Sequence, residues 1–181
     1  MQCPKCKTHP LRPTKIEPGL SAMGCLSCEG AMISLLGYRD WVESQGEVVA
    51  EADCPNTASA VSEDNDTKTA MTCPKCSRLM TKYLISGAHN NRIDLCSFCD
   101  EAWLDHGEWA LLKVLELSHQ MPKVFTDAWQ RKARKEVTEN LKINRLQSLV
   151  GEEDTERAIE LKAWLKDHPN KAALLQFMGS D

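Results

Sequence analysis

Eight of the nine cysteines in this 181-residue chain fall into two copies of one spaced pattern. Each copy has two C-x2-C pairs, separated by 18 residues in the first copy and by 19 in the second. A two-residue gap lets both thiolates of a pair reach one metal ion, and the second pair completes a tetrahedron of sulfur ligands. We therefore predict two metal sites, made by Cys3, Cys6, Cys25 and Cys28 and by Cys73, Cys76, Cys96 and Cys99.

We expect each site to hold one zinc ion, because cysteine pairs at this spacing build zinc ribbons. Iron also binds four cysteines, and spacing alone does not separate the two metals. Disulfides are a further alternative, although the reducing cytosol favours metal ligation over them. A ribbon of about 40 residues buries too little apolar surface to fold alone. Zinc binding, worth roughly 10–16 kcal/mol in small finger peptides, would supply the missing stability.

The cysteine copies lie in two of four predicted segments. Residues 47–70 are acidic and rich in Ala and Ser, which predicts a flexible linker between residues 1–46 and 71–120. Residues 121–181 contain no further metal ligands and show only helical patterns. We therefore predict a small metal-stabilised α+β fold, with two zinc ribbon–helix modules followed by an α-helical C-terminal region. Cys54 lies in the linker without a partner at ligand spacing, and we expect it to be a bystander thiol.

Local sequence signals predict the elements of each module. A helix is expected from about His106 to Gln120, with Asp105 as its N-cap and Glu108 as the capping-box partner. In the first module, Ser34 is the expected N-cap of the equivalent helix and Gly46 its end. Short strands are predicted at Leu11–Ile16, Leu79–Ile85 and Arg92–Leu95.

Three helices are predicted in the C-terminal region. Gly151 is expected to end the first, the second runs from about Glu153 to Asp167, and Asn170 caps a short third helix. Four tryptophans stand at helix-packing positions, and we expect them in the core: Trp103, Trp109, Trp129 and Trp164.

The second cysteine copy continues with the letters WLDHGE, from Trp103 to Glu108. A CPxC pair, a CxxC pair and WLDxGE together resemble the bacterial family of small zinc-ribbon proteins named for transcription factor IIB. The first copy keeps its four cysteines but has MISLLG in place of WLDxGE. The resemblance implies a zinc-binding fold and a general link to transcription or nucleic acids. Its matching residues are Cys73, Cys76, Cys96, Cys99, Trp103, Leu104, Asp105, Gly107 and Glu108.

Catalysis is not expected from this sequence. Four thiolates fill the coordination shell of a zinc ion, which leaves no position for a reactive water. His106 lies beside Asp105 and Glu108, but helix capping accounts for both carboxylates. The sequence contains no HExxH motif, no GxSxG motif and no glycine-rich phosphate-binding loop. We therefore predict a protein that is not an enzyme.

The charge of the chain favours a protein partner over nucleic acid. The net charge is −4 at pH 7, and about −8 once eight thiolates and two zinc ions are counted. Such a balance disfavours a general polyanion binder, but a local basic surface would still bind phosphates. The candidate surface is the basic helix 131–145, above all Arg131, Lys132, Arg134 and Lys135, and its alternative interpretation is an ordinary solvated face. We expect an adaptor that binds a protein partner in the gene-expression machinery.

The zinc-bound thiolates, the CPKC lysines and the N-terminal segment give three smaller expectations. Zinc-bound thiolates can be oxidised and release their metal, so a redox switch is a further functional alternative. Lys5 and Lys75, inside the CPKC pairs, are expected to offset the negative charge of the thiolates rather than contact phosphate. No signal-peptide pattern precedes Cys3, and the longest apolar stretch is too short to cross a membrane, so we expect a soluble cytoplasmic protein.

Overall fold

The computed structural model describes residues 1–46 and 69–180. Within these residues the chain forms a small α+β fold with one six-stranded antiparallel sheet and six helices. The strands are β1 (Arg12–Glu17), β2 (Leu20–Gly24), β3 (Ala31–Ser34), β4 (Thr81–Leu84), β5 (Arg92–Cys96) and β6 (Glu101–Leu104). The helices are α1 (Leu35–Ser44), α2 (Glu108–Val114), α3 (Met121–Val124), α4 (Asp127–Val150), α5 (Glu152–Lys166) and α6 (Lys171–Met178).

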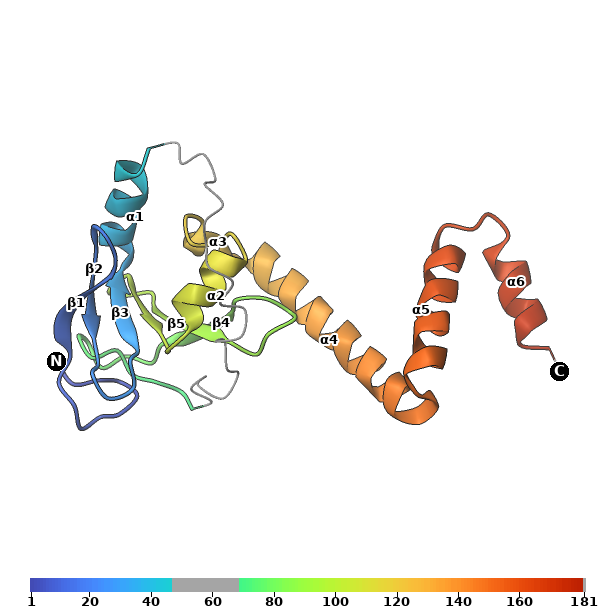
Figure 1. Ribbon diagram of the computed structural model, residues 1–181, viewed down its shortest axis with the longest axis horizontal. Coiled ribbons are helices and arrows are strands. Elements are labelled where there is room, and N and C mark those ends of the chain that lie inside the picture. Colours follow the sequence, from blue (N-terminus) through green and yellow to red (C-terminus); the bar gives the residue numbers. More distant parts are fainter. Residues whose placement is uncertain (47–68, 181) are drawn as a thin grey trace. The chain divides into compact units, whose positions relative to one another are not determined.

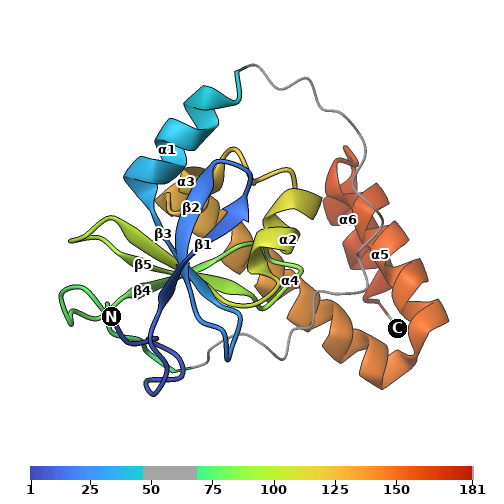
Figure 2. The same ribbon diagram turned by 60° about the vertical axis from the view of Figure 1, so that its left-hand side comes forward.

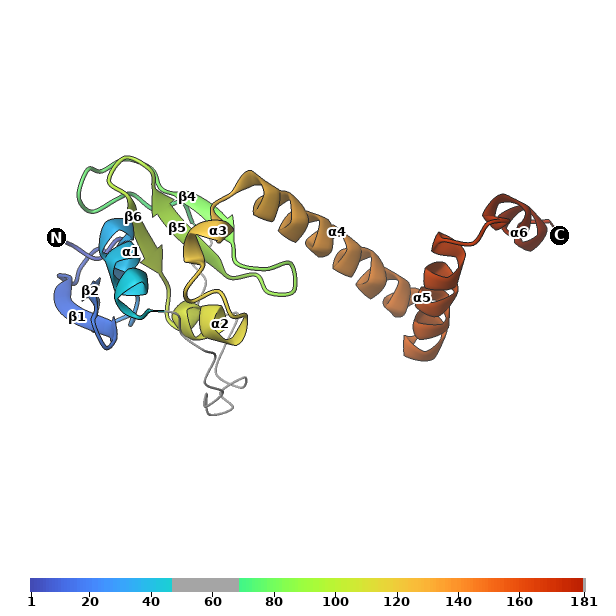
Figure 3. The same ribbon diagram turned by 90° about the horizontal axis from the view of Figure 1, so that it is seen from above.

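The two cysteine-bearing halves of the chain share the one sheet. Its strand order is β1-β2-β3-β6-β5-β4, so β3 of the N-terminal half pairs with β6 of the second half. Figure 1 shows β1, β2 and β3 in this order, and Figure 3 shows β6, β5 and β4. The β3–β6 pairing extends from Ala31 opposite Leu104 to Ser34 opposite Glu101. Where the sequence predicts two separate modules, the structure joins them, because this pairing satisfies backbone groups that two free strand edges would expose.

The predicted linker falls almost entirely on residues 47–68, which lie outside the described residues. Cys54 lies there as well. The evidence that the two halves are joined therefore comes from outside the linker, from the pairing of β3 with β6 and from the side chains around that pairing.

The sheet has two different faces. Ile33 of β3 and Leu104 of β6 lie in an apolar core together with residues of α1, α2 and α3. Their neighbours Met32 and Trp103 lie in a second apolar cluster with the cysteines. This is the alternation expected of strands, in which successive side chains point to opposite sides. We call the two sides the helix face and the cysteine face.

Two compact units make up the described chain, and the first ends at Glu136. It contains α3 and the first turns of α4, although the sequence predicts that a separate helical region begins at residue 121. Met121 and Val124 of α3 are buried in the core of the helix face. Gln130 of α4 binds both backbone groups of Leu84: its Oε1 accepts from the N–H at 3.1 Å, and its Nε2 donates to the carbonyl at 2.9 Å. These contacts attach the start of the helical region to the sheet.

The second unit, from Val137 onward, contains the rest of α4 together with α5 and α6. Among its described residues only Thr155 and Leu165 are buried. Trp164 is 54% exposed, so the prediction that it lies in the core is wrong. Trp103 and Trp109 are buried as predicted, and Trp129 is half-buried.

Predicted helix ends are confirmed where glycine ends the helix. Gly46 follows α1 with a φ of +66°, and Gly151 follows α4 with a φ of +88°. This left-handed conformation is readily available to glycine and ends many helices. The helix predicted from His106 to Gln120 is wrong in length and in its cap. The helix α2 is shorter, and its N-cap position is Gly107, with a φ of +89°.

The turn between β1 and β2 holds the two halves together on the helix face, and Figure 2 shows it between α1 and α2. The Glu17 carboxylate accepts hydrogen bonds from Trp109 Nε1 at 2.9 Å and from Lys113 Nζ at 2.7 Å. Trp41 Nε1 donates to the carbonyl of Pro18 at 3.0 Å. Burial alone would raise the pKa of Glu17, but the bonds from Lys113 and Trp109 outweigh it and lower the pKa below its ordinary value of 4.5.

Replacing Glu17 with glutamine is expected to lower the free energy of unfolding at pH 7 by about 0.5–1 kcal/mol, the usual range for a partly exposed ion pair. Because the pKa of Glu17 is lower in the folded state, its contribution is complete above pH 4.5 and is lost as the pH falls through the lowered value. Urea unfolding of both proteins, at pH 7 and at lower pH values where the metal stays bound, measures the difference between their free energies of unfolding. Equal free energies of unfolding for the two proteins at pH 7 would contradict this assignment.

Candidate metal centres

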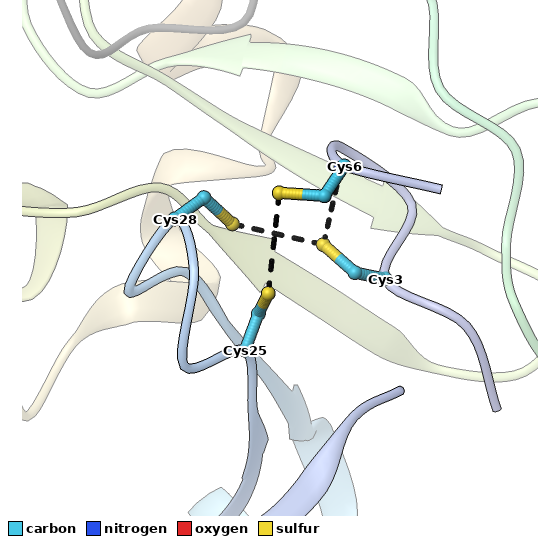
Figure 4. Close-up of side chains that lie close together, drawn as sticks. All are labelled: Cys3, Cys6, Cys25 and Cys28. Atoms are coloured by element: carbon cyan, nitrogen blue, oxygen red, sulfur yellow. Dashed lines mark hydrogen bonds between the residues drawn. The ribbon is translucent and has the colours of Figure 1, made fainter. Parts of the chain in front are cut away.

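The first cysteine site combines Cys3 and Cys6, which precede β1, with Cys25 and Cys28, which lie between β2 and β3. All four sulfur atoms lie within 4.8 Å of one another. Cys3 Sγ lies 3.6 Å from Cys28 Sγ, and Cys25 Sγ lies 4.0 Å from Cys6 Sγ. Figure 4 shows that the four side chains point toward one common centre.

The second cysteine site repeats this arrangement in the second half of the chain. Cys73 and Cys76 precede β4, Cys96 ends β5, and Cys99 precedes β6. Its sulfur atoms also lie within 4.8 Å of one another, with 3.6 Å between Cys76 Sγ and Cys96 Sγ. The cysteines of both sites are free thiols rather than disulfides.

The donor sets fit a tetrahedral metal ion. Metal–sulfur bonds of about 2.3 Å, as formed by zinc, place the four sulfurs of a tetrahedron about 3.8 Å apart. The sulfur–sulfur distances of 3.6–4.0 Å agree with this geometry. The structure thus brings together all eight predicted ligands, and each group of four could hold one metal ion.

All four C-x2-C pairs share one backbone conformation. The residue after each pair has a left-handed φ between +52° and +60°, although none of them is glycine. In three of the pairs its N–H donates to the carbonyl of the first cysteine at 2.8–2.9 Å. Such a conformation costs a non-glycine residue about 1–2 kcal/mol, which metal binding would offset. The four residues are Lys7, Glu29, Ser77 and Asp100.

The thiols within each site differ in acidity. Burial would raise the pKa of Cys25, but the backbone N–H groups of Cys28 and Ser27 outweigh it and lower the pKa to about 7. The backbone N–H of Arg78 likewise lowers the pKa of Cys76 to about 7. A hydrogen bond with Cys76 raises the pKa of Cys99 to about 12. A bound cation would replace the remaining thiol protons, so metal affinity rises with pH.

The lysines of the CPKC pairs bind carboxylates of the sheet. Lys5 Nζ lies 3.2 Å from Asp105 Oδ1, and Lys75 forms an ion pair with Glu101. Both carboxylates are buried, with 1% and 5% of their side chains exposed. Lys5 therefore joins the two halves, beyond the predicted role of offsetting thiolate charge. Glu101 was missed from the sequence, where nothing distinguishes it from a surface acid.

The residues of the WLDxGE segment support the second half of the sheet. Trp103 Nε1 donates to Asp105 Oδ1 at 2.9 Å, and the N-cap position of α2 is Gly107 rather than the predicted Asp105. The buried Glu108 carboxylate accepts from the backbone N–H groups of Asp105, at 2.8 Å, and of Arg92, at 3.0 Å. The capping-box bond from Glu108 is thus present, but it closes a turn between β6 and α2. His106, next to this turn, lies 2.9 Å from Glu29 of the other half.

The predicted nucleic-acid residues lie apart from the cysteines in sequence, on α4. Arg131, Lys132, Arg134 and Lys135 are all exposed. Lys132 Nζ lies 3.9 Å from Glu136, one turn further along the helix. No described helix is both long enough and apolar enough to span a membrane.

Comparisons of the chain with protein-family models, with curated proteins and with solved structures found no match. Metal binding is therefore inferred from the spacing and the geometry of the eight cysteines alone.

Proposed function

We propose that this protein is a non-enzymatic adaptor, in which two zinc ions stabilise two joined ribbon–helix modules and the helices of the second unit bind a protein partner. Zinc is favoured because four thiolates at these distances suit its tetrahedral coordination. A site with four protein sulfurs has no open position for substrate or water, which supports a structural role for the metal.

The exposed apolar side chains of the second unit are the observation that carries this proposal. Nine of its large apolar residues are 39–78% exposed, whereas a domain with its own core would bury most of them. Large exposed apolar surfaces mark sites of protein association, and aromatic residues contribute most of the binding energy there. The exposed residues are Leu141, Leu149, Val150, Ile159, Leu161, Trp164, Leu175, Phe177 and Met178.

Charge defines the partner further. The first turn of α5 is acidic, with Glu152, Glu153 and Asp154, and Glu156 and Glu160 follow on the same helix. A complementary partner therefore presents an apolar surface, such as one face of a helix, with lysine or arginine at its rim. The resemblance of residues 73–108 to ribbons named for transcription factor IIB favours a partner in the gene-expression machinery.

Direct binding of nucleic acid is the second candidate, and the exposure of Arg131, Lys132, Arg134 and Lys135 favours it. A redox switch is a further candidate, favoured by the partial exposure of the second cysteine in every pair. The acidic balance of the chain and the exposed apolar helices make a protein partner the better-supported proposal.

A pull-down from native lysate tests this function, with each sample divided into nuclease-treated and untreated halves. We expect a discrete partner that survives nuclease treatment and is lost when Trp164 and Phe177 are both replaced by aspartate, because two charges would then enter an apolar interface. The matched control is Leu36→Asp, which changes an exposed leucine on α1 and should leave capture unchanged.

Three outcomes would contradict the protein-partner proposal. A partner that is lost with nuclease and with charge reversal at Arg131, Lys132, Arg134 and Lys135 would indicate nucleic-acid binding. A stable dimer of the purified protein that the same aspartate variant dissociates would mean that the helices bind a second copy. Equal capture by the double aspartate variant and by the wild type would show that these helices do not bind the partner.

A further inference from the structure

One row of cross-strand neighbours runs across all six strands on the cysteine face. Pro13 lies opposite Met23, and Met23 opposite Met32. Met32 lies opposite Trp103 at the centre of the sheet. Beyond Trp103, the row continues with Asp94 and Lys82. Half of this row is therefore apolar, and the other half holds an ion pair and an indole ring.

The central pair relates the two halves by an approximate twofold axis. Moving 71 positions along the chain takes Cys25 to Cys96, Met32 to Trp103 and Ser34 to Asp105. In the β3–β6 pairing, Ala31 lies opposite Leu104 and Ile33 opposite Ala102, and the same shift exchanges these two pairs. Lys75 likewise occupies the position in its CPKC pair that Lys5 occupies in the other.

On the cysteine face, side chains of the second half cover the position next to Lys5. The indole of Trp103 lies there. The Asp105 carboxylate accepts from Trp103 Nε1 at 2.9 Å and lies 3.2 Å from Lys5 Nζ. The Lys82–Asp94 ion pair, at 2.7 Å, completes this half of the row. An aromatic ring and a carboxylate two residues apart thus close the surface beside a CPKC lysine.

The first half has the smaller residues Met32 and Ser34 at these positions, and a groove of about 460 Å³ is present there. Apolar side chains, two serine hydroxyl groups, two lysines and one carboxylate line it, among them Pro13, Met23, Ser34, Lys15, Lys75 and Glu101. Its volume lies within the range of about 300–1,000 Å³ that is usual for ligand pockets. All of these residues belong to the first unit.

The chemistry of the groove indicates what it binds. Methionine thioethers pack well against aromatic rings, with about 0.3–1.5 kcal/mol per contact. Lys15 is exposed and has no ion-pair partner among the residues that the structure describes, and Lys75 has further N–H donors beyond the one that binds Glu101. Pro13 and Met23 thus offer an apolar surface for a ring, and the two lysines leave one positive charge in excess of Glu101 for a carboxylate.

We propose that this groove binds an extended peptide segment that carries an aromatic side chain and, two residues later, a carboxylate. The ring lies on Pro13 and Met23, since Met32 is only 2% exposed, and the carboxylate lies between Lys15 and Lys75. Side chains two residues apart point to the same side of an extended segment, so one peptide presents both groups together. In the first half, the ring and the carboxylate of the ligand correspond to the ring of Trp103 and the carboxylate of Asp105 in the second half. This site is separate from the helical surface of the proposed function and does not depend on it.

The test uses the chain's own closing segment as the probe. N-acetyl-Trp-Leu-Asp-amide is titrated into the ¹⁵N-labelled, metal-loaded full chain and followed by amide chemical shifts. We expect saturable shifts at Met23, Met32 and Ser34, and weaker binding of the matched peptides with Asn for Asp or Ala for Trp. Shifts that are equal for all three peptides, or that centre on other residues, would overturn the proposal.

Two variants test the same site from the side of the protein. Ser34→Asp places an internal carboxylate beside Lys75 and is expected to weaken binding about tenfold or more, because like charges then meet. Aspartate is also a favoured N-cap residue, so α1 should remain folded. Lys15→Gln is expected to weaken binding about threefold through loss of an exposed ion pair, whereas Lys135→Gln should have no effect. Unchanged affinity in both Ser34→Asp and Lys15→Gln would overturn the proposal.

Discussion

Replacing Cys96 with serine is expected to unfold most of the first unit and to reduce the bound metal from two ions per chain toward none. Structural zinc contributes roughly 10–16 kcal/mol in finger peptides, which matches or exceeds the roughly 5–15 kcal/mol total stability of a typical domain. Both sites would be lost together because their buried cysteines share one apolar cluster with Met32 and Trp103. Metal analysis after gel filtration, together with far-UV circular dichroism, measures both effects.

The matched control for this variant is Cys54→Ser, which removes the one cysteine outside both predicted sites and should leave two bound ions. A Cys96→Ser protein that keeps one ion and a folded N-terminal half would contradict the coupling. It would show that the halves fold as independent modules and that the β3–β6 pairing contributes little to their stability.

Replacing Trp103 with alanine is expected to lower the free energy of unfolding by about 3–5 kcal/mol, the usual cost of removing a large buried aromatic side chain. Trp103 is fully buried, and its ring packs directly on the backbone just before β3: a Cβ added at Gly30 would overlap Trp103 Cζ2. Its Nε1 hydrogen bond to Asp105 would also be lost. Denaturant unfolding at a fixed zinc concentration measures the change.

Trp164→Ala is the matched control for Trp103→Ala, because the Trp164 side chain is 54% exposed. We expect it to change the free energy of unfolding by less than about 0.5 kcal/mol. Similar losses in the two variants would mean that Trp103 does not hold the halves together.

The cysteine sites were predictable because metal ligation depends on local spacing. A C-x2-C pair fixes two ligands by itself, and the sequence contains two matched sets of such pairs. Glycine-terminated helices were predictable for a similar reason, since Gly46 and Gly151 act within one turn of the residues they follow.

The joining of the halves was not predictable, because it depends on two short strands far apart in sequence. Ala31–Ser34 and Glu101–Leu104 each have four residues and directly precede helical signals, so local patterns assign them to helix starts. The ion pair between Asp105 and Lys5 of the other half depends on this long-range pairing, so local sequence signals do not reveal it. The exposure of Trp164 was equally hidden, because helical spacing does not reveal which partner covers an apolar side chain.

X-ray absorption at the zinc edge, combined with native mass spectrometry of the reduced protein, tests the central claim most directly. Two zinc ions per chain, each with four sulfur neighbours at about 2.3 Å, are the predicted result. A chain without zinc, a disulfide-bonded chain, or a site with nitrogen or oxygen in place of one sulfur would contradict a pair of closed structural sites.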